Sequence, residues 1–494
     1  MIWEVLYILI IVGYFLSLGW ITLFSFGQLN LAIHYLKSRK KQKQTILISD
    51  WPAVTIQLPI YNEKYVVDRL LEAVAKMDYP TGKLSVQILD DSTDETTQLI
   101  ASKIEALKDS KVTFEHIRRP DRIGYKAGAL AYGLSQTPDQ FIAIFDADFV
   151  PPTDFLKKTL PHFHTEKIGM VQTRWGHINE NYSLLTQMQA FGLNAHFSVE
   201  QVGRLKSGSF INFNGTGGIW RKACIEEAGG WQHDTLTEDL DLSYRAQLAG
   251  WQFEFVEDIE CPAELPVMVP AIKSQQYRWN KGAAESARKH LGTILKAGLS
   301  FPVKLRATMH LLNSSVFFAL LVAATLSIPM LYIKDIMPSL GIWFDIGTVF
   351  VLGFMAIGFF YWAATASMSS ARSRRSYYLK NFPLFMIFSM GLALHNSIAI
   401  LEGFIGKKTP FIRTPKFNVV ASSDSWQANT YIRSIQSITP STWIEALLSL
   451  YFLFGAFYGL YIEDFGLLLW HIMLSIGFGI VSLLSFKATS HASA

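Results

Sequence analysis

Charged residues and cysteines are both scarce in this chain of 494 residues. Asp, Glu, Lys and Arg make up 17% of it, whereas hydrophobic residues make up 50%. Soluble proteins carry about 25% charged residues, so the composition argues against a chain that is soluble throughout. Its two cysteines, Cys224 and Cys261, are too few for a disulfide framework and fit a reducing compartment. The net charge of +4 gives no reason to expect a nucleic-acid partner.

The apolar residues gather in long runs, with one wide interval between them. A helix that spans a bilayer needs roughly 20 apolar residues, and no such run lies between Lys37 and about Pro302. The sequence therefore predicts a soluble domain of ordinary size inserted between membrane segments. The runs lie at about Val5–Ile33, Met309–Leu331, Ile346–Ser367, Phe382–Ile405, Trp443–Ile462 and Phe465–Phe486.

Basic residues predict the orientation of these runs. The first run is too long for a signal peptide and lacks a small-x-small cleavage site. Because cytosolic flanks of membrane helices are rich in Lys and Arg, we expect the amino terminus outside and the large domain in the cytosol, at a plasma or inner membrane. The basic residues after the first run are Lys37, Arg39, Lys40, Lys41 and Lys43.

The run Phe382–Ile405 conflicts with this rule. If it crossed the bilayer, the basic residues between Lys407 and Lys416 would lie outside. We therefore expect a re-entrant or interfacial helix here. The predicted segments are a membrane helix in 1–36, a soluble domain in 45–300, a membrane hairpin in 305–370, the interfacial helix and its loop in 371–440, and a second hairpin in 441–488.

The soluble interval alternates strand and helix patterns. Strands are expected at Val54–Ile60, Val86–Leu89, Val112–Ile117 and Phe141–Phe145, and helices at Tyr65–Met77, Glu95–Leu107 and Lys126–Leu134. Such alternation predicts an α/β fold with a parallel, Rossmann-like sheet and helices on both faces.

Two acids follow the most apolar of these strands. Asp146 and Asp148 come directly after Phe141–Phe145. In extended backbone, residues two apart point the same way, and open α/β sheets bind ligands at the carboxyl ends of their strands. Paired carboxylates at that edge suit Mg²⁺ or Mn²⁺ held against a diphosphate. Taken alone, such a pair is also common in surface turns.

Further polar motifs follow along the chain, and each also has a structural explanation. Acids after strands are common in turns, acids at helix starts act as caps, and a basic amphipathic helix can lie at the membrane surface. The motifs are Pro59–Glu63, Asp90–Asp94, Tyr125–Ala129, Thr237–Asp241 and Gln275–Trp279.

Taken in order, these motifs resemble one family. Asp90-Asp91, Asp146-Ala-Asp148, Thr237-Glu238-Asp239 and Gln275-Gln276-Tyr-Arg278-Trp279 are similar to the motifs of processive membrane glycosyltransferases of the cellulose, hyaluronan and chitin synthase type, which have a GT-A fold. The flanking residues, including Phe213–Gly218 and Arg413–Phe417, look most like those of the cellulose-synthase-like mannan and glucan synthases.

The resemblance implies an inverting transferase that uses a nucleotide-diphosphate sugar, GDP-mannose or UDP-glucose, to extend a β-linked polysaccharide and move it across the bilayer. It implies Mg²⁺ or Mn²⁺ as cofactor, held by Asp146 and Asp148. Accessory export proteins are possible further partners. The other implied roles are Asp239 as base with Glu238 beside it, Glu63, Asp90, Asp91, Lys126, Asp146 and Arg278 at the donor, Gly215, Thr216, Gln275, Gln276 and Trp279 at the acceptor, and Arg413, Thr414 and Lys416 in a gating loop.

Two alternatives remain open at this point. A non-processive transferase acting on a lipid acceptor would share the acidic motifs, and the length of the product would distinguish it. A transporter or channel without catalytic activity would have no use for this set of acids in a soluble domain.

Overall fold

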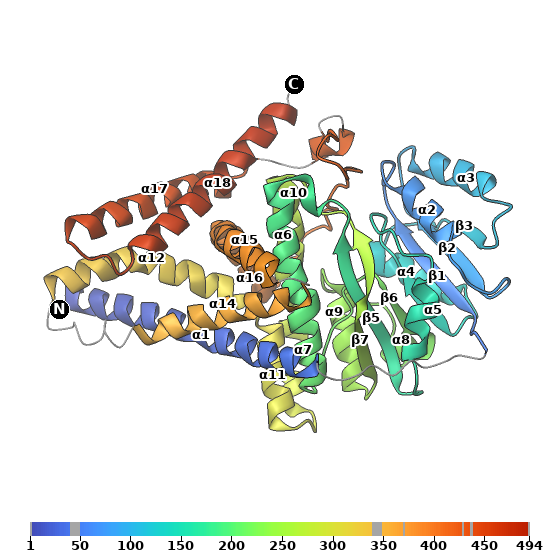
Figure 1. The fold of residues 1–494 in the computed structure, drawn as a ribbon, viewed down its shortest axis with the longest axis horizontal. Helices are drawn as coiled ribbons and strands as arrows, with labels where there is room; N and C mark the ends of the chain where they lie inside the picture. Colours follow the sequence, from blue (N-terminus) through green and yellow to red (C-terminus); the bar gives the residue numbers. More distant parts are fainter. Residues whose placement is uncertain are drawn as a thin grey trace.

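The computed structural model describes residues 2–39, 50–337, 348–368, 371–426, 429–434 and 438–492. Figure 1 shows a bundle of long helices beside an α/β domain. The amino-terminal helix α1 (Ile2–Ser38) packs against α12 (Ser315–Ile336) and α14 (Val351–Ala364). The predicted combination of one α/β domain with apolar helices from both ends of the chain is therefore present.

The sheet has seven strands in the order β3-β2-β1-β4-β6-β5-β7. It is mixed, which corrects the prediction of a parallel sheet: β6 runs antiparallel to both β4 and β5. The reason is the long helical excursion between β5 and β6, which returns the chain to the sheet from the carboxyl end of β4. The strands are β1 (Val54–Ile60), β2 (Leu84–Asp90), β3 (Thr113–Ile117), β4 (Phe141–Ile144), β5 (Ile168–His177), β6 (Gly218–Arg221) and β7 (Gln252–Ala263).

Helices cover both faces of the sheet, as predicted. The strand β4 contributes Phe141 and Ala143 to one core and Ile142 and Ile144 to the other. This two-sided burial explains why its sequence is continuously apolar rather than alternating. One face carries α2 (Val67–Ala75), α3 (Thr96–Ala106) and α5 (Phe155–Thr159), and the other carries α4 (Tyr125–Ser135), α7 (Gln201–Lys206), α8 (Lys222–Glu227) and α9 (Glu238–Leu248).

Helices between the sheet and the bundle join the two parts. α6 (Leu184–Ala195) and α10 (Val269–Lys296) stand there in Figure 1, and α11 (Phe301–Leu311) follows α10. The end of α1 also reaches the domain, because the hydroxyl of the fully buried Tyr35 donates to Glu257 at 2.8 Å. The junction is therefore a packed interface.

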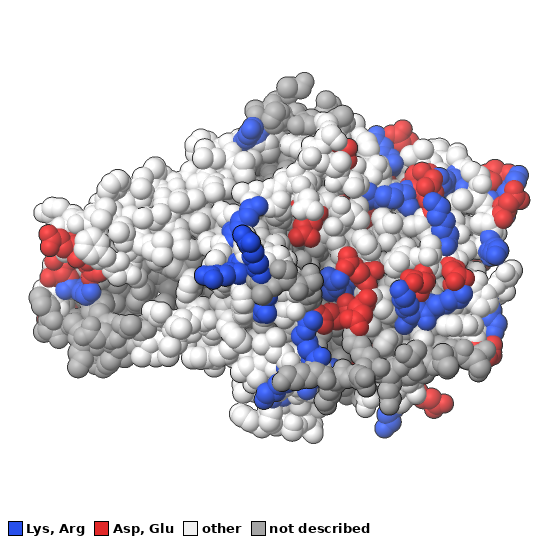
Figure 2. Space-filling view, viewed as in Figure 1, with Lys and Arg blue, Asp and Glu red and all other residues white. Residues whose placement is uncertain are grey.

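Among the described residues, four helices are long and apolar enough to cross a membrane: α1, α12, α17 (Pro440–Tyr461) and α18 (Leu468–Ala492, counted to Ala488). Figure 2 agrees, since charged side chains cover the α/β domain and most of the bundle surface lacks them. The expected span at Ile346–Ser367 stays a prediction: its α-helix α14 has 14 residues, and 3-10 turns at Thr348–Phe350 and Thr365–Ser367 continue it at both ends. Lys40, Lys41 and Lys43 lie outside the described residues.

The segment expected to be interfacial or re-entrant is a bent pair of helices. α15 (Ala371–Gly391) and α16 (Ala393–Ile405) meet at an angle of 52°, the geometry of a broken span or a re-entrant loop. After Gly406 the chain runs back to the α/β domain, where the backbone N–H of Phe417 donates to Glu264 at 2.8 Å. The loop after α16 and the α/β domain therefore lie on the same side of the bundle.

This contact predicts a common sidedness. Cysteines introduced by Ser422→Cys in the loop and Gln98→Cys on α3 should react alike with a membrane-impermeant thiol reagent in intact cells, because both positions are exposed on one body. The natural cysteines are buried and are replaced by alanine for the measurement. Labelling of one position before permeabilisation and of the other only afterwards would contradict the arrangement.

Candidate active site

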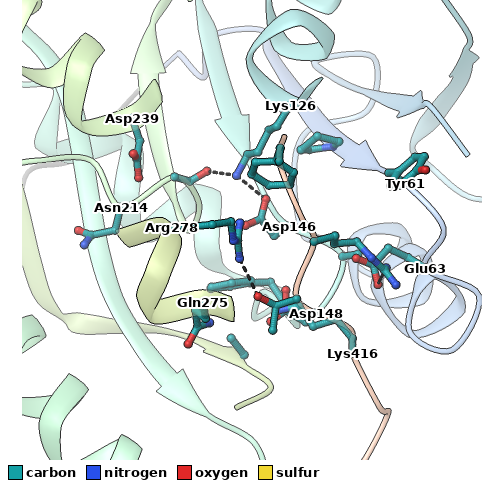
Figure 3. Close-up of a pocket in the computed structure, with 18 of the residues that line it drawn as sticks. Tyr61, Glu63, Lys126, Asp146, Asp148, Asn214, Asp239, Gln275, Arg278 and Lys416 are labelled. Atoms are coloured by element: carbon teal, nitrogen blue, oxygen red, sulfur yellow. Dashed lines mark hydrogen bonds and ion pairs between the residues drawn. The ribbon is translucent and has the colours of Figure 1, made fainter. Parts of the chain in front are cut away.

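One pocket opens at the carboxyl ends of β1, β2 and β4 (Figure 3). β1 lies between β2 and β4 in the sheet, so the loops after these strands meet where the order of strands reverses, the usual ligand edge of an open α/β sheet. Most residues selected from the sequence line this pocket: Glu63, Asp91, Lys126, Asp146, Asp148, Gly215, Glu238, Asp239, Gln275, Arg278, Trp279, Arg413, Thr414 and Lys416.

Asp146 and Asp148 lie at the centre, as the strand pattern predicted. The backbone N–H of Asp146 donates to the hydroxyl of Thr216 at 2.9 Å, which ties the turn after β4 to the loop just before β6. Asp148 is buried, and its carboxylate pairs with Lys416 at 2.6 Å. The two acids therefore already have cationic or backbone partners from this chain.

Lys126 reaches into the pocket from the first turn of α4. Its ammonium lies 2.6 Å from Asp146 and 3.9 Å from Glu238, and it donates to the carbonyl of Gly215 at 3.0 Å. Burial by itself would lower the pKa of Lys126, but Asp146 and Glu238 raise it on balance. The turn before the helix is tight: a Cβ on Gly128 would lie 2.0 Å from the carbonyl oxygen of Ile123, which explains the Lys-Ala-Gly sequence.

Glu238 and Asp239 begin α9. Burial raises the pKa of Asp239, and the charge of Glu238 raises it further. A carboxylate with a raised pKa is a stronger base, which suits removal of a proton from a hydroxyl group. Gly215 leaves room beside it, since a Cβ there would lie 3.1 Å from Asp239 Oδ2, and its φ of +83° favours glycine.

α10 brings Gln275, Arg278 and Trp279 to one wall. These residues are three and four positions apart, so they share a face of the helix, and all three line the pocket. Arg278 donates to the hydroxyl of Thr414 at 2.7 Å, and its guanidinium carbon lies 4.7 Å from the centre of the Phe411 ring.

The loop after α16 closes the pocket. Arg413 pairs with Glu63 at 2.6 Å, and Lys416 pairs with Asp148 at the same distance. Burial raises the pKa of Glu63 to about 7, although Arg413 and Lys416 counteract the rise. All three residues of the predicted gating loop thus contact side chains that were predicted to bind the donor or its metal ion.

Part of the pocket was missed by the sequence analysis. The guanidinium carbon of Arg122 lies 3.3 Å from the centre of the Tyr61 ring, and both residues line the pocket. Beside them, Arg119 holds Asp91 through two hydrogen bonds of 2.8 and 2.6 Å. A flat aromatic ring with stacked cationic groups suits a nucleobase. The arginines that come shortly before Lys126 in the sequence could have indicated this part of the pocket.

Three predicted site residues do not line this pocket. Asp90 is buried behind it, where it accepts from Thr97 at 2.9 Å and contacts His116 at 2.9 Å. Thr216 is fully buried. Gln276 instead lines a second cavity, which shares Leu193, Gln275 and Trp279 with the first and lies among apolar helices.

Asp146 and Asp148 by themselves supply only part of the coordination of a divalent cation. No group of three or more His, Cys, Asp and Glu in the described ranges forms a complete metal site. Asp146 and Asp148 supply hard carboxylate oxygens, and a diphosphate with water would complete the coordination that Mg²⁺ or Mn²⁺ prefers. The donor set therefore fits such an ion.

A mixed sheet with paired acids after its fourth strand defines a GT-A type transferase fold, and comparison with known proteins agrees. Residues 52–282 match the family described as "Glycosyltransferase like family 2", so the chain carries a glycosyltransferase domain of this family. A mannosyltransferase from Pyrobaculum calidifontis, solved with GDP-Man and Mn²⁺, has a similar fold, with a TM-score of 0.51 and 17% identity over 79% of this chain and 99% of that one.

Plant proteins are similar over a longer stretch. A probable glucomannan 4-beta-mannosyltransferase 4 of Oryza sativa subsp. japonica is 38% identical over 361 residues, 72% of this chain and 63% of the rice protein. Glucomannan 4-beta-mannosyltransferase 7 of Arabidopsis thaliana is 39% identical over 287 residues, 56% of this chain and 50% of that protein. The predicted family resemblance and fold class are thereby confirmed, and the chain spans between half and two thirds of these relatives.

The Lys416–Asp148 pair predicts a change in metal affinity. Because a cation bound at Asp148 must first displace the ammonium, Lys416→Met should tighten binding of Mn²⁺ to the substrate-free protein about three- to tenfold, roughly the value of a partly buried ion pair. Electron paramagnetic resonance of free Mn²⁺ measures this. Asp148→Asn should weaken binding in either background, and equal affinity in the wild type and Lys416→Met would contradict the assignment.

Proposed function

We propose that the protein is an inverting membrane polysaccharide synthase that transfers mannose from GDP-mannose to a growing β-linked chain. The observation that carries this proposal is the convergence of a donor site, a carboxylate base and an acceptor wall on one pocket that continues into the helix bundle. The names of the plant relatives and of the archaeal structure support mannose over glucose.

The donor is proposed to lie along the strand ends. Its base stacks at Tyr61 and Arg122, with Asp91 and Glu63 near the nucleoside. Its diphosphate lies at Lys126 and Arg278, whose positive charges stabilise the charge that grows on the leaving group. Asp90 acts indirectly in this proposal, since it is buried under Asp91 and holds the turn.

The acceptor hydroxyl is proposed to lie against Asp239. Asp239 takes the hydroxyl proton while the oxygen bonds to the anomeric carbon of mannose and the bond from that carbon to the diphosphate breaks. Attack from the face opposite the diphosphate turns an α-linked donor into a β-linked product. Asp146 and Asp148 would hold a divalent cation, which supplies charge neutralisation at the diphosphate.

The second cavity is proposed as the path of the product. Aromatic rings and amides, the groups that hold sugar rings, line it, and it continues from Gln275 and Trp279. Asn396 lies in its wall, fully buried, and neither side-chain amide atom has a hydrogen-bond partner in the described structure. Such a group needs a partner, and a sugar hydroxyl would supply one. This continuity favours a polymer over a lipid acceptor.

The loop Arg413–Lys416 is proposed to gate donor access, because its cations occupy the carboxylates that the donor site uses. The α/β domain and this loop are proposed to face the cytosol, where nucleotide sugars are made, with the amino terminus outside.

The donor and the base are tested together. Membranes given radiolabelled GDP-mannose should form a polymer that β-mannanase digests, and UDP-glucose should give none. Asp239→Asn should lower transfer about 10²–10⁴-fold, the usual cost of losing a positioned base. Asp109→Asn, an exposed carboxylate remote from the pocket, is the control and should leave transfer unchanged. Polymer formed from UDP-glucose alone would reject the donor, and near-normal transfer by Asp239→Asn would reject the base.

The pH dependence tests the pairing of the two acids. Asp239 must be ionised to act as base, so transfer falls as pH drops through its pKa. Because Glu238 raises that pKa, Glu238→Gln should lower it and move the acid limb of the residual kcat/KM profile to lower pH. Glu238→Asp keeps the charge and should leave the limb in place. If the acid limb of the Glu238→Gln profile stays in place or moves to higher pH, Asp239 is not the group that takes the proton.

A further inference from the structure

Asn214 lines the pocket in the loop just before Gly215, and the proposed mechanism gives it no role. Figure 3 shows it on the same side of the pocket as Asp239. Its backbone N–H donates to the side chain of Gln172 at 2.9 Å, which fixes the loop from behind. The side chain is therefore held in place beside the proposed base.

Hydrogen bonds determine which end of the Asn214 amide faces where. Gln201 donates from Nε2 to the backbone carbonyl of Asn212 at 3.1 Å, and a carbonyl oxygen can only accept. The same Nε2 lies 2.7 Å from Asn214, so the atom it meets is Oδ1. The Asn214 Nδ2 group consequently faces Nε2 of His196 at 2.9 Å.

This orientation also determines the tautomer of His196. Since Nδ2 of Asn214 can only donate, Nε2 of His196 accepts, and its proton resides on Nδ1. Nδ1 lies 2.6 Å from Glu200, and the Nδ1–H donates to that carboxylate. Each hydrogen bond in this series therefore has a fixed direction, from Asn214 to His196 and from His196 to Glu200. The directions are fixed by the backbone carbonyl of Asn212, which can only accept.

Glu200 is anchored in turn. It is buried and pairs with Arg204. Burial would raise its pKa, but Arg204, His196 and His310 lower it on balance, so the carboxylate stays ionised and accepting. His196 and Glu200 are the two ends of a π-helical turn, His196–Glu200, between α6 and α7. Single π turns inside α-helices are rare and occur often at functional sites.

We propose that His196 and Glu200 are positioning residues, which hold Asn214 so that its amide N–H, and not its C=O, faces the acceptor sugar beside Asp239. The contact with His196 uses one Nδ2 hydrogen, and among the contacts of the described residues the other is left for a ligand. This inference rests on the proposed transferase function.

The chemistry explains why the orientation matters. The acceptor hydroxyl must give its proton to Asp239. A C=O group from Asn214 in the same place would compete for that proton, whereas an N–H donates to a lone pair of a sugar oxygen and leaves the hydroxyl proton to the base. The network therefore selects how the acceptor ring lies and has no part in donor binding.

His196→Phe tests this by removing the accepting nitrogen while keeping a ring. With GDP-mannose and a short β-1,4-linked mannooligosaccharide, the acceptor KM should rise about three- to tenfold, the worth of one hydrogen bond. Release of GDP by hydrolysis without acceptor should stay unchanged. His196→Gln can still accept and donate and should recover part of the loss. Ser198→Ala, in the same π turn with its hydroxyl bonded to the carbonyl of Asn194, is the matched control and should behave as wild type.

The double variant distinguishes positioning from general damage. If His196 acts through Asn214, His196→Phe combined with Asn214→Ala should be no worse than Asn214→Ala alone. Additive losses, or equal loss of GDP hydrolysis and transfer, would overturn the inference. Should His196→Phe fail to fold, His196→Gln takes its place in the same cycle.

The tautomer of His196 is measured independently of activity. Solid-state NMR of nitrogen-15 histidine in the substrate-free wild type should show a neutral ring protonated on Nδ1, with the signal assigned by its loss in His196→Gln. An Nε2–H tautomer would overturn the inference even if transfer is normal. If the wild type releases no GDP from any donor while the Nδ1–H tautomer is present, the proposed function fails and the fixed orientation of Asn214 stands.

Discussion

Repulsion among carboxylates is the constraint on which the pocket depends. Seven acidic side chains line it, and several are buried, so each needs cationic or hydrogen-bonding partners. The chain supplies these from distant segments: Lys126 from α4, Arg278 from α10, and Arg413 and Lys416 from the loop after α16. The α/β domain, α10 and the loop after α16 are thus held together by the charges of the site itself.

The same charge balance links the loop to the reaction. The site without substrate is neutralised by cations of the loop. In the proposed function, a donor with a divalent ion brings two phosphates and a cation into the same space. The donor complex therefore needs a different set of partners for Glu63 and Asp148 from the one seen here. Because Glu63 has a pKa raised to about 7, its pair with Arg413 loses strength as the pH falls towards and below that value, and the loop is held less firmly.

The sequence predicted well which acids line the pocket, because strand order places acids at a known edge. The run Phe141–Phe145 and the acids after it were both recognisable from local pattern. The antiparallel strand β6 was not, since its four residues depend on pairing with β4 and β5 rather than on their own pattern. Arg122 and the His196–Glu200 turn were missed for a similar reason: their surroundings come from segments far away in the chain.

The position of α10 explains why the site lies at the bundle. One face of this helix carries Gln275 and Trp279 into both cavities, while Lys273 on the same helix forms a buried ion pair with Glu445 of α17 at 2.5 Å. A pair buried between two elements resists their separation, because parting them leaves an uncompensated charge. The wall proposed to face the acceptor is therefore fixed to a helix apolar enough to cross a membrane. In the proposed function, a sugar chain that leaves Asp239 along this wall passes directly to the helix bundle.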